Sequence, residues 1–151
     1  MAKKQTQRPK TAKTPAAGQQ TVTIDGVRYS LSNLSEPARQ QLANIQATDA
    51  EMERAKTQRS ILQTARNAYA QSLSGQLPKP AHPNRKKDVV VIDGTKYARE
   101  DFSEEAQATL SSLQFATGQI TQQDNMLAVL NTARAGYAQA LKAELPKARK
   151  R

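Results

Sequence analysis

The sequence predicts a mainly helical α+β fold, in which two tandem ββα repeats pair their long helices as an antiparallel coiled coil. The first observation is an internal duplication: when the chain is shifted by 68 residues, 21 of the 58 aligned positions between 22–79 and 90–147 are identical. Self-similarity of this extent indicates one structural unit present twice. The second and third observations are the hairpin pattern that opens each copy and the long helical pattern that follows it.

The composition favours two small units with thin cores. The chain has 151 residues, no Trp, four Tyr and two Phe. It has no cysteine, which excludes disulfides, thiolate metal sites and cysteine nucleophiles and is typical of a reducing compartment. No apolar run approaches the ~18 residues of a membrane span, so we expect a soluble, cytoplasmic protein with no membrane partner.

The net charge of +10 lies outside the repeats. Residues 22–78 carry +1 and residues 89–146 carry −3, whereas residues 1–21, 79–88 and 147–151 carry +5, +3 and +4. The expected organisation is therefore a disordered basic arm (1–20), a first ββα repeat (21–78), a basic Pro-rich linker (79–88), a second repeat (89–146) and a basic tail (147–151). The arm is predicted to be disordered because it lacks aromatic and β-branched aliphatic residues that could form a core.

Each repeat is predicted to begin with a two-stranded hairpin. Thr21 to Ile24 alternates polar and apolar residues, and the alternation resumes after Asp25-Gly26. Asp-Gly is a strong hairpin signal because the glycine tolerates a positive φ. Asp93-Gly94 repeats the signal in the second copy.

A long helix is predicted after each hairpin. Ser35 and Ser103 are suited to the N-cap position, and the acidic residues that follow each of them complement the positive end of the helix dipole. No breaker follows in the first copy until Gly75, so each helix would span ~40 residues and ~60 Å. Gly118 could mark a kink. The expected apolar stripes are Leu42, Ile45, Met52, Ala55, Leu62, Ala65, Tyr69 and Leu73, and Leu110, Leu113, Ile120, Leu127, Leu130, Ala133, Tyr137 and Leu141.

The linker length predicts how the two helices pair. Ten linker residues span at most ~35 Å, so they cannot bring the chain back along a helix of ~60 Å. The second hairpin should therefore lie near the end of the first helix, and the second helix should return antiparallel along it.

Four segments resemble a family of short, uncharacterised bacterial and phage proteins that contain one such hairpin and helix. They are Ile24-Asp25-Gly26, Leu34-Ser35-Glu36-x-Ala38, Leu113-Gln114-Phe115 and Leu130-x-Thr132-Ala133-Arg134-x-x-Tyr137-Ala138. The resemblance covers both repeats and neither tail. It implies kinship and a bacterial or phage origin, and it carries no activity over to this chain.

No residue pattern points to catalysis, a metal or a cofactor. His82 is the only histidine and lies in the Pro-rich linker, where it has no cysteine or second histidine as a partner. Asp25 and Asp93 are typical turn residues. The acidic residues Asp49 and Glu51 have no acidic counterparts in the second copy. We therefore expect a protein that is not an enzyme.

The sequence predicts sequence-tolerant nucleic-acid binding as the function, with a protein-interaction module as the alternative. The first is a nucleic-acid-associated protein that binds the phosphate backbone of DNA or RNA, or an acidic protein, through flexible cations. The second is a protein-interaction module whose helical seam binds a partner helix or self-associates, with Arg66, Tyr69, Arg134 and Tyr137 as candidate partner-binding residues. Packing in or beside the seam is the favoured role for these residues, because their spacing is identical in both copies. The candidate nucleic-acid-binding residues are Lys3, Lys4, Arg8, Lys10, Lys13, Arg85, Lys86, Lys87, Arg149, Lys150 and Arg151.

Overall fold

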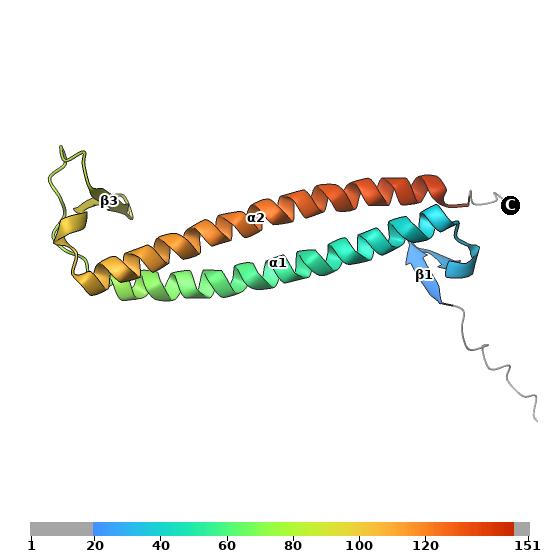
Figure 1. Ribbon diagram of the computed structural model, residues 1–151, viewed down its shortest axis with the longest axis horizontal. Helices are drawn as coiled ribbons and strands as arrows, with labels where there is room; N and C mark the ends of the chain where they lie inside the picture. The colour runs from blue at the N-terminus through green and yellow to red at the C-terminus, as the bar shows by residue number, and fades with distance from the viewer. Residues whose placement is uncertain (1–19, 147–151) are drawn as a thin grey trace, which may run out of the picture.

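The computed structural model describes residues 20–146 and contains two hairpins and two long helices. The predicted arm, apart from Gln20, and the predicted tail lie outside the described residues. The chain forms each hairpin immediately before a helix, and the two helices pack against each other along their length (Figure 1). The expected mainly helical α+β class is confirmed.

Both predicted hairpins are present. Strand β1 (Thr21–Ile24) pairs antiparallel with β2 (Val27–Ser30), and β3 (Val89–Ile92) pairs antiparallel with β4 (Thr95–Ala98). Each turn has a positive φ at both central residues, 49° and 78° at Asp25 and Gly26 and nearly the same at Asp93 and Gly94. This backbone matches the right-handed twist of the strands, which is why the Asp-Gly pair specifies a two-residue turn.

The helices begin where the capping signals predicted. Helix α1 (Glu36–Ser74) follows Ser35, whose Oγ accepts the backbone N–H of Ala38 at 3.2 Å. Helix α2 (Glu104–Glu144) follows Ser103, whose Oγ accepts the N–H of Ala106 at 3.1 Å. The short 3-10 helices Leu31–Asn33 and Arg99–Asp101 join each hairpin to its helix. Helix α2 continues through Gly118 as one helix.

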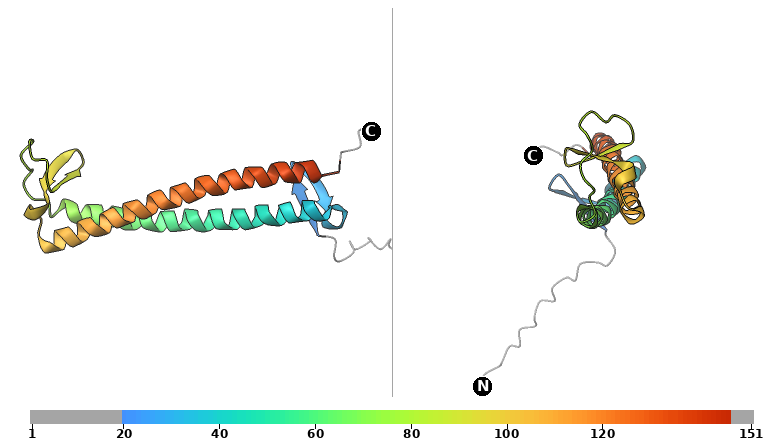
Figure 2. Two further views of the ribbon diagram at one scale, coloured as in Figure 1. Left: turned by 45° about the horizontal axis from the view of Figure 1, so that its top comes forward. Right: turned by 90° about the vertical axis from the view of Figure 1, so that its left-hand side faces the viewer.

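The molecule is a narrow rod with one hairpin at each end (Figures 1 and 2). Helix α1 runs from the first hairpin to the second, and α2 returns antiparallel beside it. Residues 79–88 make the turn between them and lie along the second hairpin, where the N–H of Ala81 donates to the carbonyl of Lys96 at 2.8 Å. The chain therefore enters and leaves the described structure at the same end of the rod, near the first hairpin.

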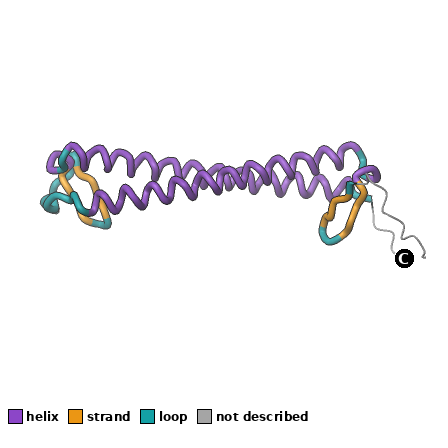
Figure 3. The backbone as a smooth tube through the Cα atoms, turned by 90° about the horizontal axis from the view of Figure 1, so that it is seen from below, coloured by secondary structure: helices purple, strands orange, loops and turns teal. Residues whose placement is uncertain are grey.

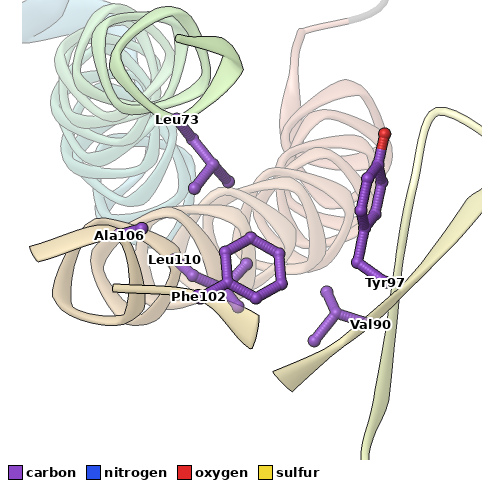
Figure 4. Close-up of a cluster of buried hydrophobic side chains, with 6 residues drawn as sticks. All are labelled: Leu73, Val90, Tyr97, Phe102, Ala106 and Leu110. Carbon is purple, nitrogen blue, oxygen red and sulfur yellow. The ribbon is translucent and has the colours of Figure 1, made fainter. Parts of the chain in front are cut away.

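Two apolar clusters hold the hairpins onto the helix ends. At the second hairpin Leu73 of α1 and Leu110 of α2 are buried together with Val90, Tyr97 and Phe102 (Figure 4). The Tyr97 and Phe102 rings meet edge to face with centroids 6.0 Å apart. At the first hairpin Leu34, Ala38 and Leu141 form the buried cluster. Each hairpin, which would be marginal alone, is stabilised by covering helix surface.

Between these clusters the helices meet along a narrow seam (Figure 3). Ala55 and Ile120, both in the expected apolar stripes, are buried there. Thr48 and Ala116 are also buried, although the sequence analysis did not place them in the stripes. Small residues let the helices approach closely, but they contribute little apolar area, so the middle of the rod has a thin core.

Candidate interaction surfaces

Arginine side chains bridge the two helices across one side of the seam. Arg134 donates to both carboxylate oxygens of Asp49, at 2.6 and 3.3 Å, and Arg59 forms an ion pair with Asp124. Arg66 donates to the hydroxyl of Thr117 at 3.3 Å. Steps of ten and seven residues forward along α1, from Asp49 to Arg59 to Arg66, match equal steps backward along α2. The bridges therefore share one antiparallel register.

Two of these bridges occupy equivalent positions in the duplication. The shift of 68 residues converts Arg66 into Arg134 and Asp49 into Thr117, so Arg134 with Asp49 and Arg66 with Thr117 are the same contact made twice. The Asp49 carboxylate raises the pKa of the Arg134 guanidinium above its ordinary value, through its hydrogen bond and through charge attraction. Because the pKa is raised, the stabilising effect of the Arg134 charge is fully present below the pKa of the free guanidinium, and Arg134 stays charged throughout the usual working range.

The four residues predicted to bind a partner lie in or beside the seam. Arg66 and Arg134 contact the opposite helix of the same chain. Tyr137 is half-buried, and the Tyr69 side chain is 37% exposed. A role in partner binding stays a prediction for all four.

A different surface of α2 is unusual because it lacks charge. Between positions 106 and 141 the sequence has two charged residues, Asp124 and Arg134, and both pair with α1. Helix α1 carries nine charged residues over a similar length. A helix that only faced water would normally carry many charges on its outer side.

Exposed apolar side chains lie on this uncharged surface. Phe115 is 67% exposed, Val129 is 64% exposed, and Met126 is also exposed. Phe115 follows Leu110 by five residues and Val129 follows Asp124 by five, which places each about 140° around the helix from the side that carries the hairpin and the arginine bridges. We call this surface the outer face of α2 and define it by Phe115, Gln119, Met126, Val129, Gly136 and Ala140.

A cavity of about 370 Å³ lies beneath the second hairpin, between the end of α1 and the start of α2. Its lining includes Arg66, Leu77, Val91, Leu113 and Thr117. At the first hairpin Lys142 forms an ion pair with Asp25 at 3.1 Å, which ties the turn to α2. The equivalent residues at the second hairpin, Ser74 and Asp93, line the cavity.

Of the predicted nucleic-acid-binding residues, the structure describes three. Arg85 is half-buried and forms an ion pair with Glu100 at 2.9 Å, while Lys86 and Lys87 are exposed. The others lie outside the described residues: Lys3, Lys4, Arg8, Lys10, Lys13, Arg149, Lys150 and Arg151.

The described residues hold no group of His, Cys, Asp or Glu side chains that could bind a metal ion. The Nδ1 atom of His82 accepts the N–H of Asn84 at 3.3 Å, as expected of a turn residue. Within 20–146 neither helix is long and apolar enough to cross a membrane.

Comparisons with known proteins identify no relative. No family profile, curated protein or solved structure matches the chain.

The outer face of α2 was missed by the sequence analysis. Phe115, Met126 and Val129 fall between the positions of the expected apolar stripe. When one stripe alone is assigned to a helix, residues outside it are taken as ordinary surface residues. The signal that could have revealed the face is the absence of charge, because depletion of charged residues is the compositional mark of an interface core.

Proposed function

We propose that the protein is a non-enzymatic protein-interaction module, a duplicated ββα unit whose helices form an antiparallel coiled coil and whose partner binds the outer face of α2. The hairpins and the arginine bridges hold the two helices in one register. The rod thereby presents α2 as a long, preformed helical surface. Preformed surfaces bind well because little conformational entropy is lost on association.

The coiled-coil assignment is supported by the spacing of the seam residues. In both copies, positions at seven-residue intervals include residues that are buried or that bridge to the opposite helix, as expected of a heptad repeat. They are Ala38, Ile45, Met52, Arg59, Arg66 and Leu73 in α1, and Ala106, Leu113, Ile120, Leu127, Arg134 and Leu141 in α2. Arginine at three of these positions weakens the apolar core but specifies register, because each guanidinium must reach its own acceptor on the other helix.

The observation that carries the functional proposal is the combination of exposed apolar side chains with charge depletion on the same side of α2. Isolated exposed apolar residues are common on proteins. On α2, which has 41 residues, Phe115, Met126 and Val129 are exposed on one face, and the two charged residues in the middle of the helix both pair with α1. This combination is typical of a surface that a partner covers in the functional state.

Substitution of one valine on this face provides the test. Val129→Glu introduces a charge at the centre of the outer face, and Val91→Glu introduces the same charge at an equally exposed valine, 60% exposed, on the second hairpin. The wild type and V91E should capture a partner protein from host extract, and V129E should not. The purified partner should then bind the purified wild type and V91E, and bind V129E much more weakly. Equal binding to all three would remove the outer face of α2 as the binding site.

A second candidate function is sequence-tolerant binding to DNA or RNA through the basic segments. The observation in its favour is the position of these segments. The arm and the tail join the rod at one end, and the exposed Lys86 and Lys87 lie at the other. Cations on segments without aromatic residues can neutralise phosphates but offer no stacking surface for bases.

Truncation tests this second candidate. If about six phosphates are neutralised, log K should fall with log salt with a slope near −5 on duplex DNA. A chain cut to 21–146 should lose most of this salt dependence while keeping its helical circular dichroism. Adding K86Q and K87Q to the truncated chain should bring the slope still closer to zero. A truncated chain that binds DNA and RNA as well as the whole would exclude the basic arm and tail as the binding site.

A further inference from the structure

We propose that the occupant of the outer face of α2 is a second copy of this chain, bound antiparallel through the same face about a twofold axis between Met126 and Val129. The inference rests on the proposed function, and it names the partner of the same site. The evidence is the order of large and small side chains along the face, the charges at its ends and its area.

The large and small residues of the face are arranged so that it complements itself. When two α2 helices lie antiparallel with Val129 against Met126 of the other copy, Phe115 lies against Ala140 and Gln119 lies against Gly136. Phe115 and Gln119 then each meet a small residue, Met126 meets the shorter Val129, and the twofold axis makes each of these contacts twice. This is the property that an isologous interface requires. Because a different partner protein would not require this internal order, a second copy is the favoured occupant.

The spacing of the face also suits a helical partner. Phe115 and Val129 are separated by two heptads, as are Met126 and Ala140. The face therefore keeps the seven-residue period of the seam, and a second helix could follow it along its length.

The charges at the ends of the face are complementary in the same register. Glu104 and Glu105 open α2 and are exposed. Antiparallel pairing about the axis places them about 10 Å beyond the end of the other copy's α2, on the side where the sequence continues into 147–151, four of whose five residues are basic. Charges of opposite sign at the rim favour this orientation over a parallel one.

The area of the face is sufficient for a weak dimer. Residues 108–143 form a strip about 54 Å long and about 10 Å wide, so two copies would bury roughly 1,100 Å². Specific interfaces generally exceed ~1,000 Å², and those near this limit are weak. We therefore expect a dissociation constant in the micromolar range.

Sedimentation velocity over about 1 to about 100 μM tests the proposal at the concentrations where a dimer of this size forms. The wild type and V91E should shift with concentration from the 16.6 kDa chain toward twice that mass, and V129E should remain a monomer. The circular dichroism of V129E should match the wild type, because Val129 is exposed in the single chain. A wild type that stays monomeric at the highest concentration, or a V129E that dimerises equally well, would overturn the proposal.

Engineered cysteines test the register directly, because the natural chain has none. Phe115→Cys with Ala140→Cys should give a disulfide-linked dimer on mild oxidation. The two positions lie about 38 Å apart along one helix, so they cannot join within a chain. Phe115→Cys with Thr132→Cys is the control, and it should cross-link slowly because Thr132 lies eight residues, about 12 Å, from Ala140, the residue that faces Phe115 in this register. Equal cross-linking of the two pairs would contradict the proposed register.

The outcomes separate this inference from the proposed function. A monomeric wild type that binds another protein through Val129 would leave the interaction module standing and overturn self-association. If the wild type is a monomer, and if V129E and V91E bind other proteins as well as the wild type does, then both the self-association and the interaction module at this face are overturned.

Discussion

At the scale of single residues, glycine is required at one backbone position and is unfavourable at another. Gly94 has φ +79° in the turn of the second hairpin, whereas Gly118 lies within α2 with open space around the position of a Cβ atom. Gly94→Ala should destabilise the fold by roughly 1–2 kcal/mol because alanine disfavours this backbone. Gly118→Ala should stabilise it by about 1 kcal/mol through helix propensity. Thermal unfolding followed by circular dichroism measures both, and Gly94→Asn, which tolerates positive φ, should cost less than Gly94→Ala.

The repeated arginine bridge yields a second prediction, because the two copies use different acceptors. Thr117→Asp gives Arg66 the carboxylate that Asp49 gives Arg134, and should stabilise the fold by about 0.2–1 kcal/mol as an exposed ion pair. Asp49→Thr makes the reverse exchange and should lower the melting temperature. Both shifts should shrink in high salt because exposed charges are screened. A T117D stabilisation that is unchanged at about 1 M salt would show that the carboxylate acts through something other than Arg66.

At the scale of the elements, the two ends of the rod are related in sequence but differ in packing. Leu110 and Leu42 are equivalent leucines, yet Leu110 is 2% exposed and Leu42 is only half-buried. Leu110→Ala should cost about 3 kcal/mol, and Leu42→Ala roughly half as much, because the cost grows with the apolar surface that the leucine buries and with the cavity that its removal leaves. Chemical denaturation of the two variants measures the difference. Equal costs would mean that the first hairpin buries its leucine as completely as the second.

The elements show which parts of the fold could be predicted from sequence. Turns and helix starts depend on local chemistry, so Asp25-Gly26 and Ser35 indicated their structures correctly. The burial of Thr48 depends on its position opposite the other helix, which no local pattern reveals. The outer face of α2 was missed for a related reason. Phe115 and Val129 lie outside the seam, and whether they become buried depends on a partner that cannot be identified from the sequence of one chain.

At the scale of the whole molecule, the arginine bridges define a register that distance measurements can check. Ala43 and Ala140 lie at the same level of the rod in that register, so spin labels at these sites should be close. Ala43 and Ser111, which are equivalent in the duplication, should be about 44 Å apart along the axis, because the residue level with Ser111 lies about 29 positions beyond Ala43. Ala43 and Asn131 should fall between, about 14 Å apart along the axis.

In a dimer, spin labels on different chains also contribute distances. The distances within one chain must therefore be measured separately. Mixing labelled protein with an excess of unlabelled protein removes the distances between copies and leaves those within one chain. The order Ala43 with Ala140, then Asn131, then Ser111, from shortest to longest, should survive this dilution. If the short distance disappeared on dilution, the two helices would be pairing between chains. The hairpins at the two ends of the rod would then belong to different molecules. An order that persists shows that one chain closes its own seam, which leaves the outer face of α2 free to meet a second copy.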